Sequence, residues 1–267
     1  MKDYCLELVS QQSGANAKLN VMREYLQAYI LRIMHDEGVF RSTAFLGGTA
    51  LRFLYGLPRF SEDLDFSFTS TNSTYKFVDL AKKIKEEMLQ AGYNVSLTSK
   101  DEKTVKNAFI KFANLKYEAG ISPLKNEKLS IKLEIDTNPP EGASLKTDIV
   151  NKYFPLAFLS YDLESLFAGK LHALLSRPYS KGRDFFDLGW YLSKWKDLVP
   201  NFTLLANALK QTKWQGELPA NDNWRDLIYN TVNKTDWGSV RKDVENFLEH
   251  QADLAVFTKE NVLGLLK

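Results

Sequence analysis

The chain has 267 residues, 44% of them hydrophobic, which is enough for one large packed domain or two modest ones. Lys and Arg total 35 against 33 Asp and Glu, so a net charge of +2 excludes a uniformly basic nucleic-acid binder and any basic surface must be local. Cys5 is the only cysteine, in an N-terminus that we expect to be frayed, and no stretch has the apolar length of a signal peptide core or a membrane helix; we therefore expect no disulfide, no cysteine-based zinc cluster, no membrane contact and a cytoplasmic location.

The first 150 residues alternate between helical and strand patterns. Apolar spacing predicts helices over 16–37, 49–56 and 75–91, each followed closely by a glycine or ended by one. Alternating or β-rich runs predict strands over 42–46, 63–68, 93–99, 107–117 and 128–136. This order favours an α+β domain in which a mixed or antiparallel sheet carries helices.

Beyond residue 150 the pattern changes to successive amphipathic helices, and all five tryptophans lie in this part of the chain. We therefore predict an α/β domain over 1–150 and a helical C-terminal domain over 151–267, without a flexible linker between them. Aromatic side chains in the second domain are expected to fill its core, with an RNA platform or a protein interface as the alternatives.

Two carboxylates stand one residue apart in the predicted strand over 63–68. Asp63 and Asp65 leave the same face of that strand, with Cα atoms roughly 6.5 to 7 Å apart. Hard oxygen ligands in this arrangement suit Mg²⁺ or Mn²⁺ shared with substrate phosphates. A solvated strand end is the alternative explanation for such a pair, so the neighbouring segments must decide.

A glycine pair precedes the carboxylates by one short helix. Gly47, Gly48 and Thr49 lie between a predicted strand and a helix start, where a close backbone and free N–H groups favour phosphate. Arg52 and Arg59 are candidates for further phosphate contacts, although Arg52 could instead pair with Glu62 or Asp63. The segment thus predicts a phosphate cradle beside a metal site.

A third carboxylate is expected from the strand over 128–136. Glu134 and Asp136 share its polar face with Lys132, and either could be a metal ligand or a base toward an attacking hydroxyl. An exposed polar strand face is the alternative for both residues.

The helical part offers a second polar group. Lys170 lies among the apolar positions of a predicted helix. The start of the next predicted helix, "SKGRDFFDL", contains Lys181, Arg183, Asp184 and Asp187. Extension of its ammonium to solvent is the alternative explanation for Lys170, and helix capping with ion pairing is the alternative for the other four residues.

Four segments together resemble the AbiEii/AbiGii nucleotidyltransferase toxin family of bacterial abortive-infection and toxin–antitoxin systems. They are "GGTALRFLYGLPRFSEDLDF", "IKLEI", "LESLFAGKLHALLSR" and "GRDFFDL", in that order. The resemblance implies the polymerase-β-like nucleotidyltransferase fold: a mixed sheet with flanking helices, followed by a helical domain. The family's Ser-x-Asp-x-Asp arrangement matches Ser61, Asp63 and Asp65, and its lysine matches Lys170.

The resemblance also implies roles for individual residues. Asp63 and Asp65 would hold Mg²⁺ (or Mn²⁺) against a nucleoside triphosphate (NTP), and the 47–49 segment would hold its phosphates. Lys170 and Arg183 would contact the triphosphate or stabilise the transition state, and Asp184 and Asp187 would orient these two cations or the nucleotide. Ser61 belongs to the nucleotide site. The family pattern favours Glu134 as the third carboxylate, whereas polymerase-like sites commonly use an Asp, which keeps Asp136 as a third metal ligand.

The implied function is transfer of a nucleotide from an NTP to an acceptor, with RNA such as tRNA leading and a cognate antitoxin as partner. Asp-x-Asp phosphatases are disfavoured because "GLPRFSE" precedes Asp63 where they have an apolar strand, and glycosyltransferases because only 62 residues precede it. A non-catalytic module that binds nucleotide, RNA or a protein partner is the remaining alternative. Lysines at 100, 103, 106, 111 and 116 are a candidate basic rim, or a solvated face in view of Asp101, Glu102 and Glu118.

Overall fold

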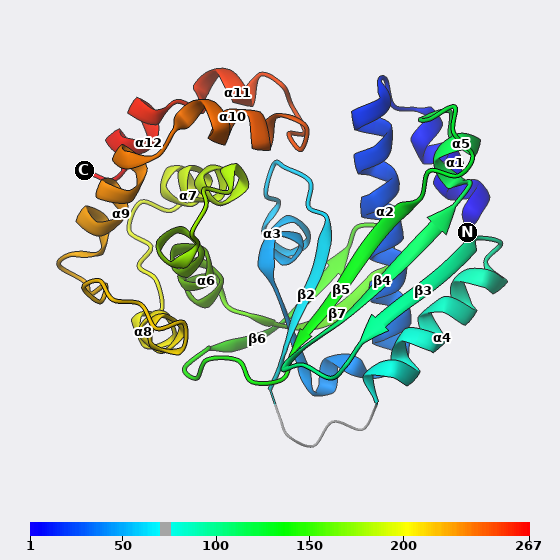
Figure 1. Cartoon of the computed structure of the whole chain (residues 1–267), viewed down its shortest axis with the longest axis horizontal. Helices are drawn as coiled ribbons and strands as arrows, with labels where there is room; N and C mark the ends of the chain where they lie inside the picture. The colour runs from blue at the N-terminus through cyan, green and yellow to red at the C-terminus, as the bar shows by residue number, and fades with distance from the viewer. Residues whose placement is uncertain (70–75) are drawn as a thin grey trace. The chain divides into compact units, whose positions relative to one another are not determined.

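A computed structural model describes residues 1–69 and 76–267 (Figure 1), and these residues form two compact units. The sheet unit comprises 1–56, 60–138 and 147–160, and the helical unit comprises 57–59, 139–146 and 161–267. The main division thus falls after Ser160, whereas the sequence placed it at 150/151. The reason is that 145–161, which the sequence pattern left unassigned, supplies two further strands.

The described residues contain a seven-stranded mixed sheet in the order β3-β4-β5-β2-β1-β7-β6, so the predicted sheet class is confirmed. β1 pairs antiparallel with β2 and parallel with β7, while β2 pairs parallel with β5. β3, β4 and β5 form an antiparallel set. The strands are β1 (Thr43–Leu46), β2 (Asp63–Phe68), β3 (Asn94–Lys100), β4 (Val105–Ala113), β5 (Leu129–Asp136), β6 (Leu145–Asn151) and β7 (Pro155–Tyr161).

Helices of the sheet unit pack against the sheet and against one another. α2 lies against β5, and α4 lies against β3 and β4, while α1 packs on α2. Gly38 and Gly56, both with positive φ, follow α2 and α3 and end the helical pattern as predicted. The helices are α1 (Lys2–Ser10), α2 (Ala15–Asp36), the short 3₁₀ helix η1 (Val39–Arg41), α3 (Gly47–Tyr55), α4 (Phe77–Gln90) and α5 (Leu115–Glu118).

The helical unit is built from seven α-helices in its described residues, as the sequence pattern predicted. Side-chain caps define several of their starts: Asp162 accepts a hydrogen bond from Ser165 N at 2.8 Å, and Asn201 accepts one from Leu204 N at 3.1 Å. The helices are α6 (Leu163–Ser176), α7 (Gly182–Lys194), α8 (Phe202–Gln211), α9 (Trp224–Lys234), α10 (Trp237–Glu245), α11 (Asp253–Val256) and α12 (Lys259–Leu265).

Aromatic side chains fill both cores. In the sheet unit, Phe45 of β1 stacks on Phe66 of β2 with ring centroids 5.1 Å apart. In the helical unit, Phe167 of α6 stacks on Tyr191 of α7 at 4.5 Å and meets the buried Trp224 of α9 edge-on at 5.7 Å. Such pairs add to the area that each ring buries, and core packing is therefore one use of the C-terminal aromatics.

Two local predictions are wrong. The N-terminus is not frayed: it forms α1, in which Cys5 and Val9 are buried and whose end is fixed by a 3.3 Å hydrogen bond from Tyr25 Oη to Met1 O. The strand predicted over 107–117 stops at Ala113, because Asn114 adopts a left-handed conformation and starts α5. Tyr75, which the predicted helix over 75–91 includes, lies outside the described residues.

Candidate active site

The predicted metal carboxylates lie on the central strand β2. Asp63 and Asp65 are half-buried, and their neighbours Leu64 and Phe66 point into the core, so the two carboxylates share the opposite face. In the parallel pairing with β5, Asp63 stands beside Lys132 and Asp65 beside Glu134. Adjacent strands lie about 4.8 Å apart, which makes Asp65 and Glu134 immediate neighbours on the sheet.

The same register separates the two candidates for the third carboxylate. Asp136 pairs with Ser67, one pleat beyond the carboxylate pair, and its Oδ1 accepts a hydrogen bond from Asn138 N at 2.9 Å. Glu134 lies beside Asp65 and forms a 2.7 Å ion pair with Lys132 on its own strand. The position of Glu134 is thus the closer match to a site centred on Asp63 and Asp65.

The glycine turn approaches the carboxylates directly. Gly47 has a φ of +80°, and a Cβ at this position would fall within contact distance of Asp65 Oδ2. Only glycine satisfies both conditions. α3 begins here, and its N-cap residue Leu46 makes no side-chain cap hydrogen bond. The first N–H groups of the helix, which favour anions, therefore lie at the glycine turn next to β2.

Three further residues of the sheet unit that were predicted to bind nucleotide, Gly48, Thr49 and Ser61, lie close to α3 and β2 in the chain. Thr49 is buried, and its hydroxyl donates to the carbonyl of Asp63, which fixes the start of α3 on β2. Ser61 is half-buried, and its carbonyl accepts a 3.1 Å hydrogen bond from Gln27 Nε2. Gly48 follows as a buried residue of the first turn of α3.

Arg52 is buried and points to a partner that sequence reasoning did not identify. Its Nε pairs with Glu24 of α2, and its guanidinium lies 4.0 Å from the ring centroid of Phe60. Glu24 also receives Lys152 Nζ and Tyr153 Oη, each at 2.9 Å. Burial and the Glu24 carboxylate together raise the pKa of Tyr153, so its phenol stays protonated and donates to Glu24. A charged residue amid the apolar run of α2 was the signal for Glu24.

The helical unit contains a buried ion cluster. Asp187 is fully buried and receives Nε and a terminal nitrogen of Arg59, each at 2.6 Å, together with Lys170 Nζ at 2.6 Å. Lys170 Nζ also lies 3.1 Å from Asp184 Oδ1, and Arg177 pairs with Asp184 Oδ2. Arg59 therefore neutralises a buried carboxylate of the helical unit, and Lys170 forms ion pairs with both Asp184 and Asp187.

The electrostatics of this cluster favour the ionised carboxylates. Burial by itself raises the pKa of Asp184, but the fields of Lys170 and Arg177 outweigh it and leave that pKa below its usual value. Burial lowers the pKa of Lys181, and the nearby Arg183 lowers it further. Arg183 itself lies over the ring of Phe247 at 4.1 Å and pairs with Asp243 at 3.8 Å.

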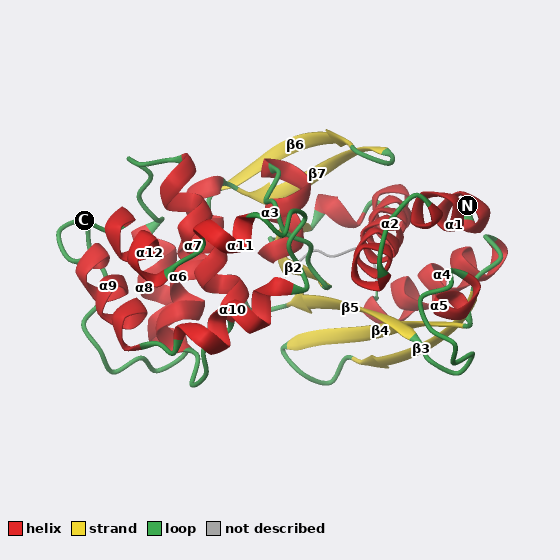
Figure 2. Ribbon diagram, turned by 90° about the horizontal axis from the view of Figure 1, so that it is seen from above, coloured by secondary structure: helices red, strands yellow, loops and turns green. Residues whose placement is uncertain are grey.

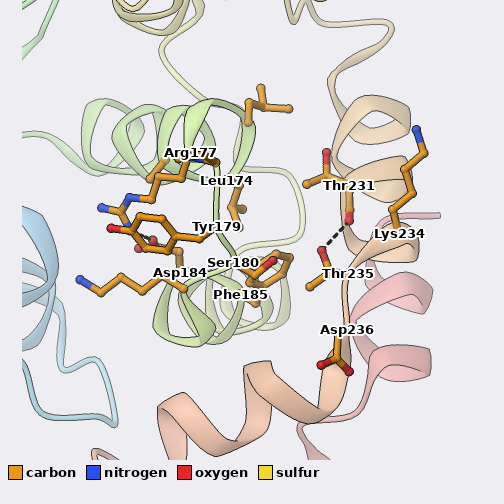
Figure 3. Close-up of a pocket in the computed structure, with 14 residues that line it drawn as sticks. Leu174, Arg177, Tyr179, Ser180, Asp184, Phe185, Thr231, Lys234, Thr235 and Asp236 are labelled. Carbon is orange, nitrogen blue, oxygen red and sulfur yellow. Dashed lines mark hydrogen bonds and ion pairs between the residues drawn. The ribbon is translucent and has the colours of Figure 1, made fainter.

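A pocket of about 330 Å³ lies beside this cluster in the helical unit (Figure 3). Arg177, Tyr179 and Asp184 line one side, and Thr231 and Thr235 of the α9 end line the other. The Arg177–Asp184 ion pair is thus part of the pocket wall. Arg177 was missed by sequence reasoning, although it ends α6 in the segment that carries Lys170.

The sheet-unit carboxylates suit a divalent metal ion. In residues 1–69 and 76–267, no group of three or more His, Cys, Asp or Glu side chains forms a complete metal site. Magnesium, however, is commonly held by one or two carboxylates and completes its shell with water and substrate phosphates. Asp63 and Asp65 supply that number of hard oxygen donors, beside the helix start at Gly47.

Two solved structures share this fold. A "putative nucleotidyltransferase" from H. pylori superposes with a TM-score of 0.55 at 22% identity, covering 92% of this chain and 91% of that one. JHP933 from Helicobacter pylori gives a TM-score of 0.53 at 22% identity, covering 91% of this chain and 87% of that one. No curated protein matches the sequence. The mixed sheet and its flanking helices are therefore a known architecture.

Residues 29–258 match the family model described as nucleotidyl transferase AbiEii toxin, type IV TA system. The match includes all four sequence segments that indicated the resemblance. This chain belongs to the AbiEii nucleotidyltransferase toxin family. None of the described helices has the length and apolar character that crossing a membrane requires.

Proposed function

We propose that this toxin transfers a nucleoside monophosphate from an NTP to a hydroxyl group of RNA, with tRNA as the leading acceptor, and that Mg²⁺ or Mn²⁺ is required. The observation that carries the proposal is the juxtaposition of Asp63 and Asp65 with the Gly47 turn. One segment supplies anionic metal ligands, and the other supplies the backbone N–H groups of a helix start, which suit phosphate. Family membership supports nucleotidyl transfer as the reaction type.

The residues of the sheet unit then have distinct tasks. Asp63 and Asp65 hold the metal-bound NTP, and the backbone of 47–49 orients its phosphates for in-line attack on the α-phosphate. Glu134, beside Asp65 on β5, is placed to accept the proton of the attacking hydroxyl or to complete the metal shell. When bound, the metal neutralises charge on the phosphates and on the leaving pyrophosphate.

Contacts of Lys170 and Arg183 with the triphosphate remain a prediction. Within the helical unit, Lys170 is 12% exposed and already held by two carboxylates, which fixes its ammonium in one position. Fixed cations of this kind stabilise developing negative charge without reorganisation. Asp184 and Asp187 are proposed as positioning residues for Lys170, and a cognate antitoxin as the partner that restrains the toxin.

Incubation of the protein with Mg²⁺, each labelled NTP in turn and total bacterial RNA tests the proposal. We expect one or more NTPs to label RNA, chelation to abolish labelling, and Asp65→Ala to relieve growth arrest on expression. NTP binding without transfer to any RNA would support a binding module instead. Equal growth inhibition by wild type and Asp65→Ala would contradict the catalytic account.

A further inference from the structure

The sheet extends beyond the carboxylates as a polar face with one aromatic ring. β3, β4 and β5 turn alternate residues to one side, and their register aligns them in rows across the strands. We call this surface the platform face. It consists of Ser96, Thr98, Lys100, Asn107, Phe109, Lys111, Ser130 and Lys132, all exposed or half-buried.

Helices of the same unit lie on the opposite side of these strands. Figure 2 shows α2 and α4 on one side of β3, β4 and β5, and in the described part of the unit no helix lies on the other side. Ala108, Ile110 and Phe112 of β4 point toward the helices and are fully buried. The alternate residues of β4 therefore form the side without a helix, and Phe109 is on it.

Phe109 is flanked by two lysines. Lys111 Nζ and Lys132 Nζ each lie 6.0 Å from the centroid of its ring. Lys111 also lies 3.4 Å from the hydroxyl of Thr98 on the next strand, so its ammonium stays on the platform face. An aromatic ring bordered by cations and hydroxyls is the pattern that stacks nucleobases while holding the backbone phosphates.

The platform face runs directly into the carboxylates. Phe109 pairs with Lys132, and Lys132 pairs with Asp63, so the three residues form one row across β4, β5 and β2. Two strand spacings place the backbone of Phe109 about 10 Å from that of Asp63.

The glycine turn lies on the other side of the carboxylates. Gly47 follows β1, which pairs with β2 on the edge opposite to β5. The helix start that suits NTP phosphates and the platform face are thus on opposite sides of Asp63 and Asp65. Each of the two substrates of a transfer reaction has its own surface.

We propose that the platform face binds the single-stranded end of the nucleic-acid acceptor, with a base stacked on Phe109 and phosphates at Lys111 and Lys100. This inference rests on the proposed nucleotidyl transfer and adds the acceptor's binding surface to it. Positive charge at Lys100 and Lys111 matches phosphate. The carboxylates on the same side of the sheet are Glu134 and Asp136 of β5 and Asp63 and Asp65 of β2, on the strands where the acceptor's terminal hydroxyl must react.

Direct binding tests the proposal without turnover. The affinity of a 5′-labelled single-stranded RNA of mixed sequence is measured by fluorescence anisotropy, in the absence of NTP, for wild type and Phe109→Ala. We expect Phe109→Ala to weaken binding by about 5- to 100-fold, from the loss of one stacked base, and Phe109→Tyr to retain the wild-type affinity. Circular dichroism of each variant verifies that the sheet is intact.

The chain provides a matched control. Tyr117 of α5 is 44% exposed and has Lys125 Nζ 5.0 Å from its ring centroid, so it repeats the aromatic–lysine pair away from the platform face. Tyr117→Ala should leave RNA affinity unchanged. Lys111→Gln should reduce the slope of log affinity against log salt by about 0.7, the value for one phosphate contact on a single strand.

Three results would overturn the inference. They are equal RNA affinity of wild type and Phe109→Ala, an equal loss in Tyr117→Ala, or a loss of NTP affinity with RNA affinity intact, which would assign the ring to the incoming nucleotide. The two proposals fail separately. Stacking on Phe109 without any transfer would contradict only the reaction, whereas transfer that is insensitive to Phe109→Ala would contradict only the platform.

Discussion

Acidic side chains are used in opposite ways by the two units. In the sheet unit, Asp63, Asp65 and Glu134 are half-buried on neighbouring strands beside a helix start. In the helical unit, Asp184 and Asp187 are buried and enclosed by the side chains of Lys170, Arg59 and Arg177. The first group lies on a partly exposed strand face, where we propose that it binds a metal ion and phosphate, whereas the second is enclosed in a buried ion cluster.

Burial and ion pairing distinguish carboxylates that we propose to take part in the reaction from carboxylates that stabilise the fold. Each charge of a buried ion pair needs an opposite charge beside it, because removal of one partner leaves the other charge unpaired in a low-dielectric interior. Asp63 and Asp65 are instead half-buried on a strand face, and the positive φ of Gly47 and its close approach to Asp65 leave room there only for a residue without a side chain. Substitutions in the first group should affect turnover with little change in folding, whereas substitutions in the second should affect folding as well as the position of Lys170.

The largest effect on folding is expected at Asp187. Asp187→Asn keeps the shape of the side chain but leaves Arg59 and Lys170 without their shared charge, and should lower the free energy of unfolding by about 3 to 5 kcal/mol. Urea denaturation measures it. Asp243→Asn, at a 39% exposed carboxylate that pairs with Arg183, is the control and should cost less than about 1 kcal/mol. Similar losses in both variants would contradict the role assigned to the cluster.

Glu134 and Asp136 provide the next test, this time of turnover. Glu134→Gln should reduce the rate of nucleotide transfer by about 100-fold or more, the usual contribution of a positioned base. Asp136→Asn, one pleat away beside Ser67, should change that rate by less than about threefold. The reverse order of the two effects would assign the third carboxylate to Asp136.

Two glycines with positive φ, one at each end of α3, provide a further test of the site. Gly47→Ala places a Cβ against Asp65 and should reduce transfer in addition to costing about 1 to 3 kcal/mol of stability. Gly56 has a φ of +71° at the other end of α3, and a Cβ there would meet nothing within 4 Å. Gly56→Ala therefore carries the backbone cost alone, and it should keep its transfer rate. Equal activity of the two variants would remove Gly47 from the site.

The smallest predicted effect is in the acid stability of the helical unit. Because the pKa of Asp184 is lowered in the folded state, its ion pairs stabilise the fold above the ordinary carboxyl pKa of about 4, and this contribution fades as pH falls through the folded value. The stability difference between wild type and Asp184→Asn should therefore be constant from pH 5 to 7 and shrink below about pH 4. Chemical denaturation across this range measures it, and a difference unchanged down to about pH 2.5 would contradict the assignment.

Local patterns predicted much of the sheet unit. The helix ending at Gly38, the strands of 43–46 and 63–68 and the alternation along β5 all follow from residue spacing, and the structure confirms them. β6 and β7 were not predicted, since "LKTDIVN" and "PLAFLSY" lack strong turn signals and gain their strand identity from pairing in the sheet. The end of β4 depended on a single left-handed Asn114, which sequence does not specify.

The site shows the same division. Asp63, Asp65 and Gly47 are close in sequence, so their juxtaposition could be predicted from one strand–turn–helix–strand segment. Partners distant in sequence could not: Arg52 binds Glu24 of α2, and Arg59 binds Asp187, 128 residues further along the chain. Pairing between buried charges depends on tertiary packing, which no local spacing encodes.

The central claim is that Asp63 and Asp65 carry the chemistry while the fold stands without them. The most direct measurement is labelled-nucleotide transfer to RNA by Asp65→Asn, in parallel with its unfolding free energy. We predict a rate lower by about 1,000-fold or more with stability within about 1 kcal/mol of wild type. Transfer within tenfold of wild type by a folded Asp65→Asn protein would contradict the account.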